Sequence, residues 1–280
     1  MHPHAGRSYS SRIWTVAAVF FLLLAASLGL ANAEATVQPA KTQPSAKRQI
    51  LAFGGVGLEK AGTAPTLMKY FLELAGKKTP RVCFMPSGTG DAKGEITRWN
   101  DVMKTYDCQP KVQKVYIASP STKSFEAELL QADAIYIGGG NAVNMLAIWK
   151  VQGIDKIIRQ AYDRGIVLGG EGAGSICWFE QGLTDSRPGK LSIMDCLGFL
   201  KGSNCPDYDT DKSRRPLYQD WIKKGEIKDG IAADAGVALH FVDEKLVKVV
   251  GVKANAKAYR ISRTGDKAME EALPLELLAK

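Results

Sequence analysis

Short apolar segments that end in glycine or proline, separated by segments with helical spacing, constrain the fold of this sequence most. The segments predicted as strands are 50–55, 81–86, 112–117, 134–137 and 166–168, and those predicted as helices are 63–74, 94–106, 125–132, 143–149 and 153–164. Strands without polar alternation are typical of a parallel sheet that helices cover on both faces. Beyond residue 190, segments 237–241 and 246–252 favour an antiparallel pair at a sheet edge. The pattern predicts an α/β fold with a mostly parallel sheet.

The length and composition fit one domain of this class. The 280 residues are 45% hydrophobic, which is enough for a sizeable core, and they show neither an internal repeat nor an interdomain linker. We expect a single α/β domain over 49–265, followed by a C-terminal tail over 266–280. Residues 34–48, rich in Pro, Ala, Lys and Gln, are predicted as a flexible leader.

The N-terminus has the pattern of a secretory signal peptide. Arg7 and Arg12 precede an uncharged apolar run of 16 residues over 15–30, and Ala-Asn-Ala at 31–33 matches a signal-peptidase site. The alternative is an uncleaved membrane anchor, although 16 residues are few for about 30 Å of hydrocarbon. We therefore predict cleavage after residue 33, export to the periplasm or the medium, and no stable membrane anchor afterwards. Cleavage lowers the formal net charge from +8 to +6.

The charges, cysteines and histidines exclude several classes of function. Basic residues are scattered, without the runs or interleaved aromatic residues of a nucleic-acid-binding surface. The five cysteines form no C-x-x-C pair, which disfavours zinc and thioredoxin chemistry, and their odd number leaves their pairing open. Of the three histidines, only His240 lies outside the predicted signal peptide. We therefore expect no multi-histidine metal site.

Three glycine-rich loops, 54–57, 138–141 and 169–174, follow predicted strands, where the ligands of parallel sheets bind. The loop at 138–141 can present backbone N–H groups to an anion or an oxyanion. The dinucleotide fingerprint G-x-G-x-x-G is absent from its required context, and we expect no cofactor. The loop at 169–174 has the frame of a G-x-S-x-G nucleophile elbow, Gly170 and Gly174, but Gly172 occupies the serine position.

These motifs resemble peptidase E, the aspartyl dipeptidase family of serine peptidases, whose relatives include cyanophycinase. The similarity extends from about Gln49 to Ile261. It rests on YIGGGNAVNMLAIWK at 136–150, IVLGGEGAGSICWFEQGLTDS at 166–186, Cys205-Pro206 and Ala238-Leu239-His240. The resemblance implies a fold similar to class I glutamine amidotransferases. It also implies an elbow serine, a histidine base after the Cys-Pro pair, an acidic partner and an oxyanion hole of backbone N–H groups.

Carried over residue by residue, the resemblance assigns the nucleophile position to Gly172, the base position to Asp207 and the acidic position to Asp185. Gly139, Gly140 and Ala173 match the oxyanion loops, and Asn141 belongs to the same cleft. Glycine has no hydroxyl with which to form an acyl-enzyme. An aspartate, with an unperturbed pKa of about 3.9, is a weak base near neutral pH. Loss of such a catalytic unit costs on the order of 10⁶ in turnover.

Three other residues are candidates to replace the lost groups. Ser175 lies three positions after Gly172, Cys177 lies in the ICWF segment, and His240 lies in a predicted strand. For each of them a packing or capping role is the simpler interpretation. The alternating acids at 207, 209 and 211, with Glu171, raise a further alternative of cation binding. The calcium-loop pattern fails there because Lys212 stands at its glycine position, and we assign no metal site.

The sequence leaves two main hypotheses of function. The first is an exported, catalytically inactive or impaired peptidase E homologue that binds a short peptide or another small molecule. The second is a working serine-type peptidase for short peptides, either through replacement residues or as an engineered variant of an active enzyme. A glutaminase of the same fold would need a cysteine at 172 and a histidine partner, and the sequence has neither at these positions. The oligomeric state stays open.

Overall fold

The computed structural model describes residues 47–55, 64–117 and 123–279. The predicted signal peptide and all but the last two residues of the predicted leader lie outside these residues. Within the described part, no helix is long and apolar enough to cross a membrane.

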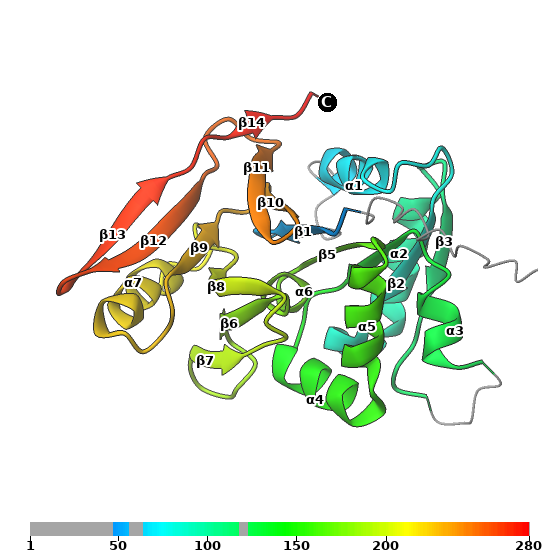
Figure 1. Cartoon of the computed structure of the whole chain (residues 1–280), viewed down its shortest axis with the longest axis horizontal. Coiled ribbons are helices and arrows are strands. Elements are labelled where there is room, and N and C mark those ends of the chain that lie inside the picture. Colours follow the sequence, from blue (N-terminus) through cyan, green and yellow to red (C-terminus); the bar gives the residue numbers. More distant parts are fainter. Residues whose placement is uncertain (1–46, 56–63, 118–122, 280) are drawn as a thin grey trace, which may run out of the picture. The chain divides into compact units, whose positions relative to one another are not determined.

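The larger of two sheets has eight strands in the order β14-β11-β10-β1-β5-β4-β2-β3 (Figure 1). Its strands are β1 (Gln49–Phe53), β2 (Arg81–Met85), β3 (Gln109–Val112), β4 (Ala134–Ile137), β5 (Val167–Glu171), β10 (Val237–Val242), β11 (Lys245–Gly251) and β14 (Glu276–Leu277). The five strands from β1 to β3 in this order run parallel, whereas β10 is antiparallel to both β1 and β11. This confirms the α/β class, the mostly parallel sheet and the antiparallel pair.

Helices cover both faces of the parallel part, because β1, β2, β4 and β5 are buried over almost their whole length. Leu51 and Phe53 of β1 pack with α1 (Ala64–Glu73) and α2 (Lys93–Met103) in one core cluster. Ile50 and Ala52 of the same strand belong to a second cluster on the opposite face. That cluster includes residues of α3 (Phe125–Leu129), α4 (Ala142–Gln152) and α5 (Ile154–Asp163). The period-two alternation of strand side chains thus builds two hydrophobic layers.

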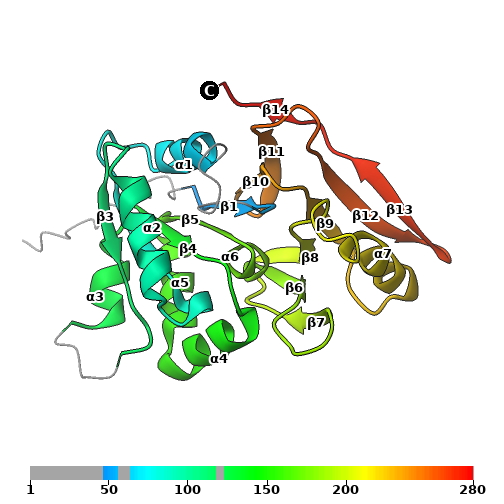
Figure 2. The ribbon, with the colours of Figure 1, turned by 180° about the vertical axis from the view of Figure 1, so that it is seen from behind.

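A second sheet of six strands has the order β13-β12-β9-β8-β6-β7. Its strands are β6 (Phe179–Thr184), β7 (Ser192–Asp195), β8 (Leu200–Cys205), β9 (Gly230–Ala233), β12 (Ala258–Thr264) and β13 (Lys267–Ala272). In both ribbon views α7 (Arg214–Lys224) lies against the β12–β13 hairpin (Figure 2). The sequence pattern did not predict this sheet.

Two sequence expectations need correction. The strand expected at 112–117 is β3 at Gln109–Val112, because Asp91 accepts the N–H groups of Val115 and Tyr116, both at 2.6 Å, and turns the chain there. Residues 266–280, expected as a tail, contain β13 and β14, which pair with β12 and β11. Glu270 of β13 accepts a hydrogen bond from Tyr208 at 2.8 Å, a contact between segments far apart in sequence.

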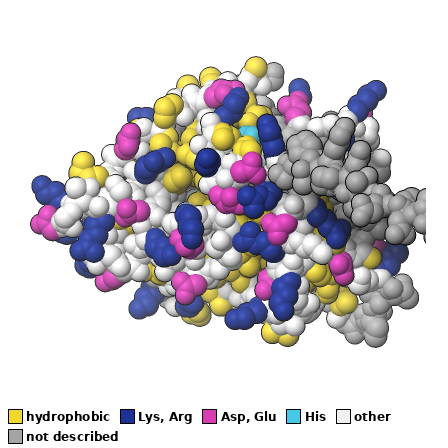
Figure 3. All heavy atoms as spheres, viewed as in Figure 1, with side chains coloured by type: hydrophobic (Ala, Val, Ile, Leu, Met, Phe, Trp, Pro, Cys, Tyr) yellow, Lys and Arg dark blue, Asp and Glu magenta, His cyan; other side chains and the backbone are white. Residues whose placement is uncertain are grey.

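The charged side chains show no segregation on the face seen in Figure 3, where Lys and Arg alternate with Asp and Glu.

All five cysteines are free thiols. Burial raises the pKa of Cys83, Cys196 and Cys205 to about 12, so these thiols remain protonated near neutral pH.

Candidate active site

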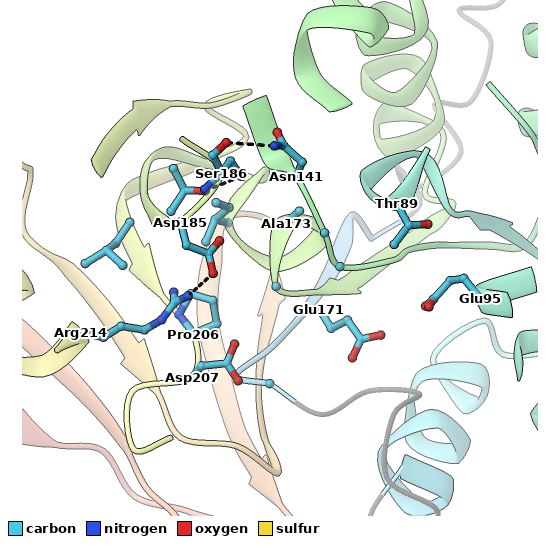
Figure 4. Close-up of a pocket in the computed structure, with 17 residues that line it drawn as sticks. Thr89, Glu95, Asn141, Glu171, Ala173, Asp185, Ser186, Pro206, Asp207 and Arg214 are labelled. Carbon is cyan, nitrogen blue, oxygen red and sulfur yellow. Dashed lines mark hydrogen bonds and ion pairs between the residues drawn. The ribbon is translucent and has the colours of Figure 1, made fainter. Parts of the chain in front are cut away.

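A cavity of about 470 Å³ lies where the ends of strands from the two sheets meet. One side, here called the elbow wall, consists of residues 139–141 after β4 and 171–173 at the end of β5. The opposite side, here called the Asp207 wall, consists of residues 183–186, 206–207 and Arg214. Seven of the sequence-predicted residues line this cavity together: Gly139, Gly140, Asn141, Gly172, Ala173, Asp185 and Asp207 (Figure 4).

Gly172 has the backbone conformation of a nucleophile elbow. Its φ of 53° and ψ of −113° lie outside the regions that residues with side chains adopt readily. It immediately precedes α6 (Ala173–Ile176). Its carbonyl oxygen accepts hydrogen bonds from the backbone nitrogens of Ser175 and Ile176, at 3.0 and 3.1 Å. Among the described residues, a Cβ built at Gly172 would touch only the Gly139 Cα, at 3.4 Å. The turn that presents a nucleophile is therefore intact and has room for a side chain.

The two glycines that frame the elbow have a different role. A Cβ at Gly174 would overlap the carbonyl of Ile137, and one at Gly170 would overlap the same carbonyl and that of Gly174. The β5–α6 turn thus packs directly against the end of β4. This close approach holds the elbow in its conformation whatever residue occupies position 172.

The loop after β4 is tied to the segment that carries Asp185. Asn141 caps α4 by accepting the N–H of Asn144 at 2.8 Å, and its Nδ2 donates to the Ser186 carbonyl at 2.9 Å. The Ala142 N–H donates to Ser186 Oγ at 2.8 Å. Among the described residues, the N–H groups of Gly139 and Gly140 have no hydrogen-bond acceptor. These donors, with the Ala173 N–H at the start of α6, are suited to bind a carbonyl oxygen or an oxyanion.

Asp207 is held in a fixed position on the opposite wall. Its φ of 55° is unusual for a residue other than glycine, and its N–H donates to the Gly54 carbonyl. Its carboxylate packs against Gly55, and Thr210 Oγ1 donates to Oδ1 at 3.5 Å. Burial raises the pKa of Asp207, as do the carboxylates of Asp209 and Asp185, whereas Arg214 opposes the shift.

Asp185 pairs with an arginine in this cavity. Arg214 Nη2 lies 3.2 Å from Asp185 Oδ2, and Arg214 Nε lies 3.4 Å from Asp211 Oδ2. The Arg214 side chain is only 9% exposed, so its charge is fixed against these carboxylates. Arg215, the next residue in the chain, instead pairs with Glu270 and lies over the Tyr208 and Tyr259 rings.

The three candidates for replacement residues do not line the cavity. Ser175 is buried and donates to Asn204 Oδ1 at 3.1 Å. Cys177 is fully buried, which raises the pKa of its thiol well above the usual value. His240 bonds through Nδ1 to the Tyr70 hydroxyl at 2.9 Å and through Nε2 to Gln49 Oε1 at 3.1 Å. Burial and the nearby Lys248 lower the pKa of His240 to about 4.

Sequence reasoning missed two lining residues, Thr89 and Glu95, and suggested Glu171 only as part of a cation site. Glu95 comes from α2 and lies 3.3 Å from Arg98, and Glu171 is 7% exposed. Nothing in the local sequence around Glu95 marks it, because only the packing of α2 beside the β4 loop brings it to the cavity. In the described part of the chain, no group of three or more His, Cys, Asp or Glu side chains could hold a metal ion.

Comparison with solved structures supports the fold. A putative peptidase E protein from Listeria monocytogenes EGD-e matches with a TM-score of 0.57 and 15% identity, over 74% of this chain and 100% of its own. A peptidase from an acI-B1 Actinobacterium matches with a TM-score of 0.62 and 16% identity, over 83% of this chain and 96% of its own. The architecture is that of peptidase E, with its glutamine amidotransferase-like fold.

The sequence comparisons show the family as well as the fold. The sequence model of peptidase family S51 matches residues 50–249, which include both walls of the cavity. The uncharacterized peptidase YgaJ from Bacillus subtilis (strain 168) is 39% identical over 231 residues, which cover 82% of this chain and 99% of that protein. With a matching family model, a relative at this identity and an intact elbow in the expected fold, this chain belongs to peptidase family S51.

Proposed function

We propose that this protein is an exported member of family S51 that binds a short peptide or a similar small molecule but hydrolyses peptide bonds poorly or not at all. The observation that carries this proposal is Gly172. The elbow turn is built and faces the cavity, yet no hydroxyl stands where a nucleophile would attack. The backbone donors around it remain available to bind a ligand.

The base position gives independent support. Asp207 lines the same cavity as Gly172, but a carboxylate there is a poor substitute for an imidazole at neutral pH. The nearby Asp185 is bound by Arg214 and has no histidine to orient. Hydrolysis through Ser175, Cys177 or His240 would require each of them to reach a cavity that none of them lines.

The test restores both groups. The purified protein and a Gly172→Ser/Asp207→His variant are assayed against a panel of dipeptides. Gly172→Ala/Asp207→His is the matched control, since it imposes the same side-chain strain without a hydroxyl. We expect turnover only in the serine variant, which should also react with a fluorophosphonate probe at position 172.

Turnover by the unmodified protein at the rate of the serine variant would falsify the proposed inactivity. Ligand binding is measured separately, as a rise in the melting temperature of the unmodified protein with members of the same panel. If no member of a panel covering acidic, neutral and basic dipeptides raises it, the binding part of the proposal fails.

Export rests on the N-terminal pattern and needs its own experiment. Expression of the full chain in a bacterial host, followed by fractionation and mass measurement, should yield a periplasmic or secreted product that begins at Glu34. Recovery of the full-length chain in the membrane fraction would instead support the uncleaved anchor.

A further inference from the structure

The described lining residues carry more carboxylates than basic groups, and one of these carboxylates, Glu95, pairs with Arg98 outside the lining at 3.3 Å. The described lining residues include four carboxylates, Glu95, Glu171, Asp185 and Asp207, and a single guanidinium, Arg214. In Figure 4, Asp185 and Asp207 lie on one side and Glu171 and Glu95 on the other. A space with acidic walls attracts positive charge and repels negative charge.

Arg214, the basic residue among the described lining residues, does not offset this excess of acidic groups for a ligand. Arg214 contacts two carboxylates, Asp185 at 3.2 Å and Asp211 at 3.4 Å, and its side chain is more than nine-tenths buried. An acidic ligand would have to displace these contacts to use the guanidinium. Its own charge would also come close to Asp207.

Asp207 is the residue that gives the Asp207 wall its excess negative charge. Resemblance to the family implies a histidine at this position, so the aspartate replaces a neutral or positive group by a negative one. Its backbone bond to Gly54 and the hydroxyl of Thr210 hold the carboxylate in the lining. The carboxylate therefore acts as a fixed charge, ready for a cation without rearrangement.

The elbow wall offers hydrogen-bond donors, which complement the negative charge of the Asp207 wall. The Gly139 and Gly140 N–H groups are donors without a described acceptor. Among the described residues, only Gly139 approaches the position that a side chain at Gly172 would take. A peptide can place a carbonyl or carboxylate oxygen at these donors. Its positively charged group would then extend toward Asp207.

From this arrangement we propose that Asp207 is a specificity-determining residue that makes the cavity select short peptides with a basic side chain over acidic ones. The inference deepens the proposed function and rests on it, because it names the ligand class of the same cavity.

The experiment titrates the purified protein with two dipeptides, Lys-Ala and Asp-Ala, by isothermal calorimetry at low and moderate salt. We expect Lys-Ala to bind at least about tenfold more tightly than Asp-Ala, with the difference shrinking as salt rises. Asp207→Asn, which keeps the shape of the side chain, should weaken Lys-Ala binding about tenfold. Asp220→Asn, which removes a carboxylate of α7 outside the cavity lining, should leave it unchanged.

Equal or tighter binding of Asp-Ala overturns the inference, as does unchanged Lys-Ala affinity in Asp207→Asn or a failure of both dipeptides to bind. These failures are distinguishable from failure of the proposed function. If neutral dipeptides bind while the charged pair shows no preference, the binding function stands and the specificity is wrong. If the unmodified protein turns over peptides, inactivity is wrong, and the charge preference is then measured as a ratio of kcat/KM.

Discussion

The two walls of the cavity differ in what shapes them. The elbow wall is shaped by its backbone, because Gly170 and Gly174 pack against the end of β4. The Asp207 wall is shaped by charged side chains, since Asp185, Asp207 and Arg214 line it. Backbone geometry that depends on close packing persists, whereas side chains that point into a cavity can change without disturbing the core.

The largest effect is expected where the elbow wall touches β4. Gly174→Ala places a Cβ on the Ile137 carbonyl and should lower the free energy of unfolding by about 3 kcal/mol. Gly94→Ala in α2 is the control, because a Cβ there meets nothing within 4 Å and should raise stability by up to about 1 kcal/mol. Urea denaturation measures both. Equal effects at the two positions would mean that packing does not hold the elbow.

The next effect concerns position 172 itself. Gly172→Ser should cost about 1–2 kcal/mol of unfolding free energy, because a side chain is strained at a φ of 53°. Gly172→Ala should cost the same, since the strain comes from Cβ and not from the hydroxyl. Chemical denaturation of both variants tests this. A stabilising serine would contradict the expected strain of a side chain at this position.

A smaller effect is expected at His240, which lies outside both walls of the cavity. Because His240 has a folded pKa of about 4, below its usual 6.5, the unfolded chain binds more protons between these values. His240 is therefore neutral and its contribution to stability is complete above pH 6.5, and this contribution is lost as pH falls toward 4. We expect a loss of about 1 kcal/mol between pH 7 and 5 that is smaller in His240→Gln. Denaturation at several pH values measures it, and an unchanged pH slope in the variant would contradict it.

The smallest effect is expected at Asp207. Burial raises its folded pKa above 3.8, so the ionised carboxylate is destabilising near neutral pH, and this penalty disappears as pH falls below the folded pKa. Asp207→Asn should therefore raise the melting temperature by about 1–3 °C at pH 7 and by less at pH 4. A melting temperature that falls at pH 7 would show that contacts of the Asp207 carboxylate stabilise the fold. The negative charge of this wall would then serve stability and not ligand selection.

Much of the parallel core could be predicted from the sequence. β4 has the bounds Ala134–Ile137 expected from its apolar run, and β1, β2 and β5 differ only slightly at their ends. The elbow was predictable because its glycines are contiguous in sequence and their spacing reflects a local turn. The second sheet was missed because β7, β8 and β9 are short and only partly apolar, and their partners lie far away in the chain.

The residues of the cavity also fall into those that the sequence predicts and those that only the tertiary structure reveals. The sequence alone determined that residues 172 and 207 are Gly and Asp, and the family resemblance assigns them to the nucleophile and base positions. Only the tertiary structure decided that Glu95 joins the cavity, that Arg214 rather than Arg215 binds Asp185, and that Ser175, Cys177 and His240 lie outside it. The physical reason is that motifs encode local backbone geometry, whereas the charge and reach of a cavity depend on which distant elements pack around it.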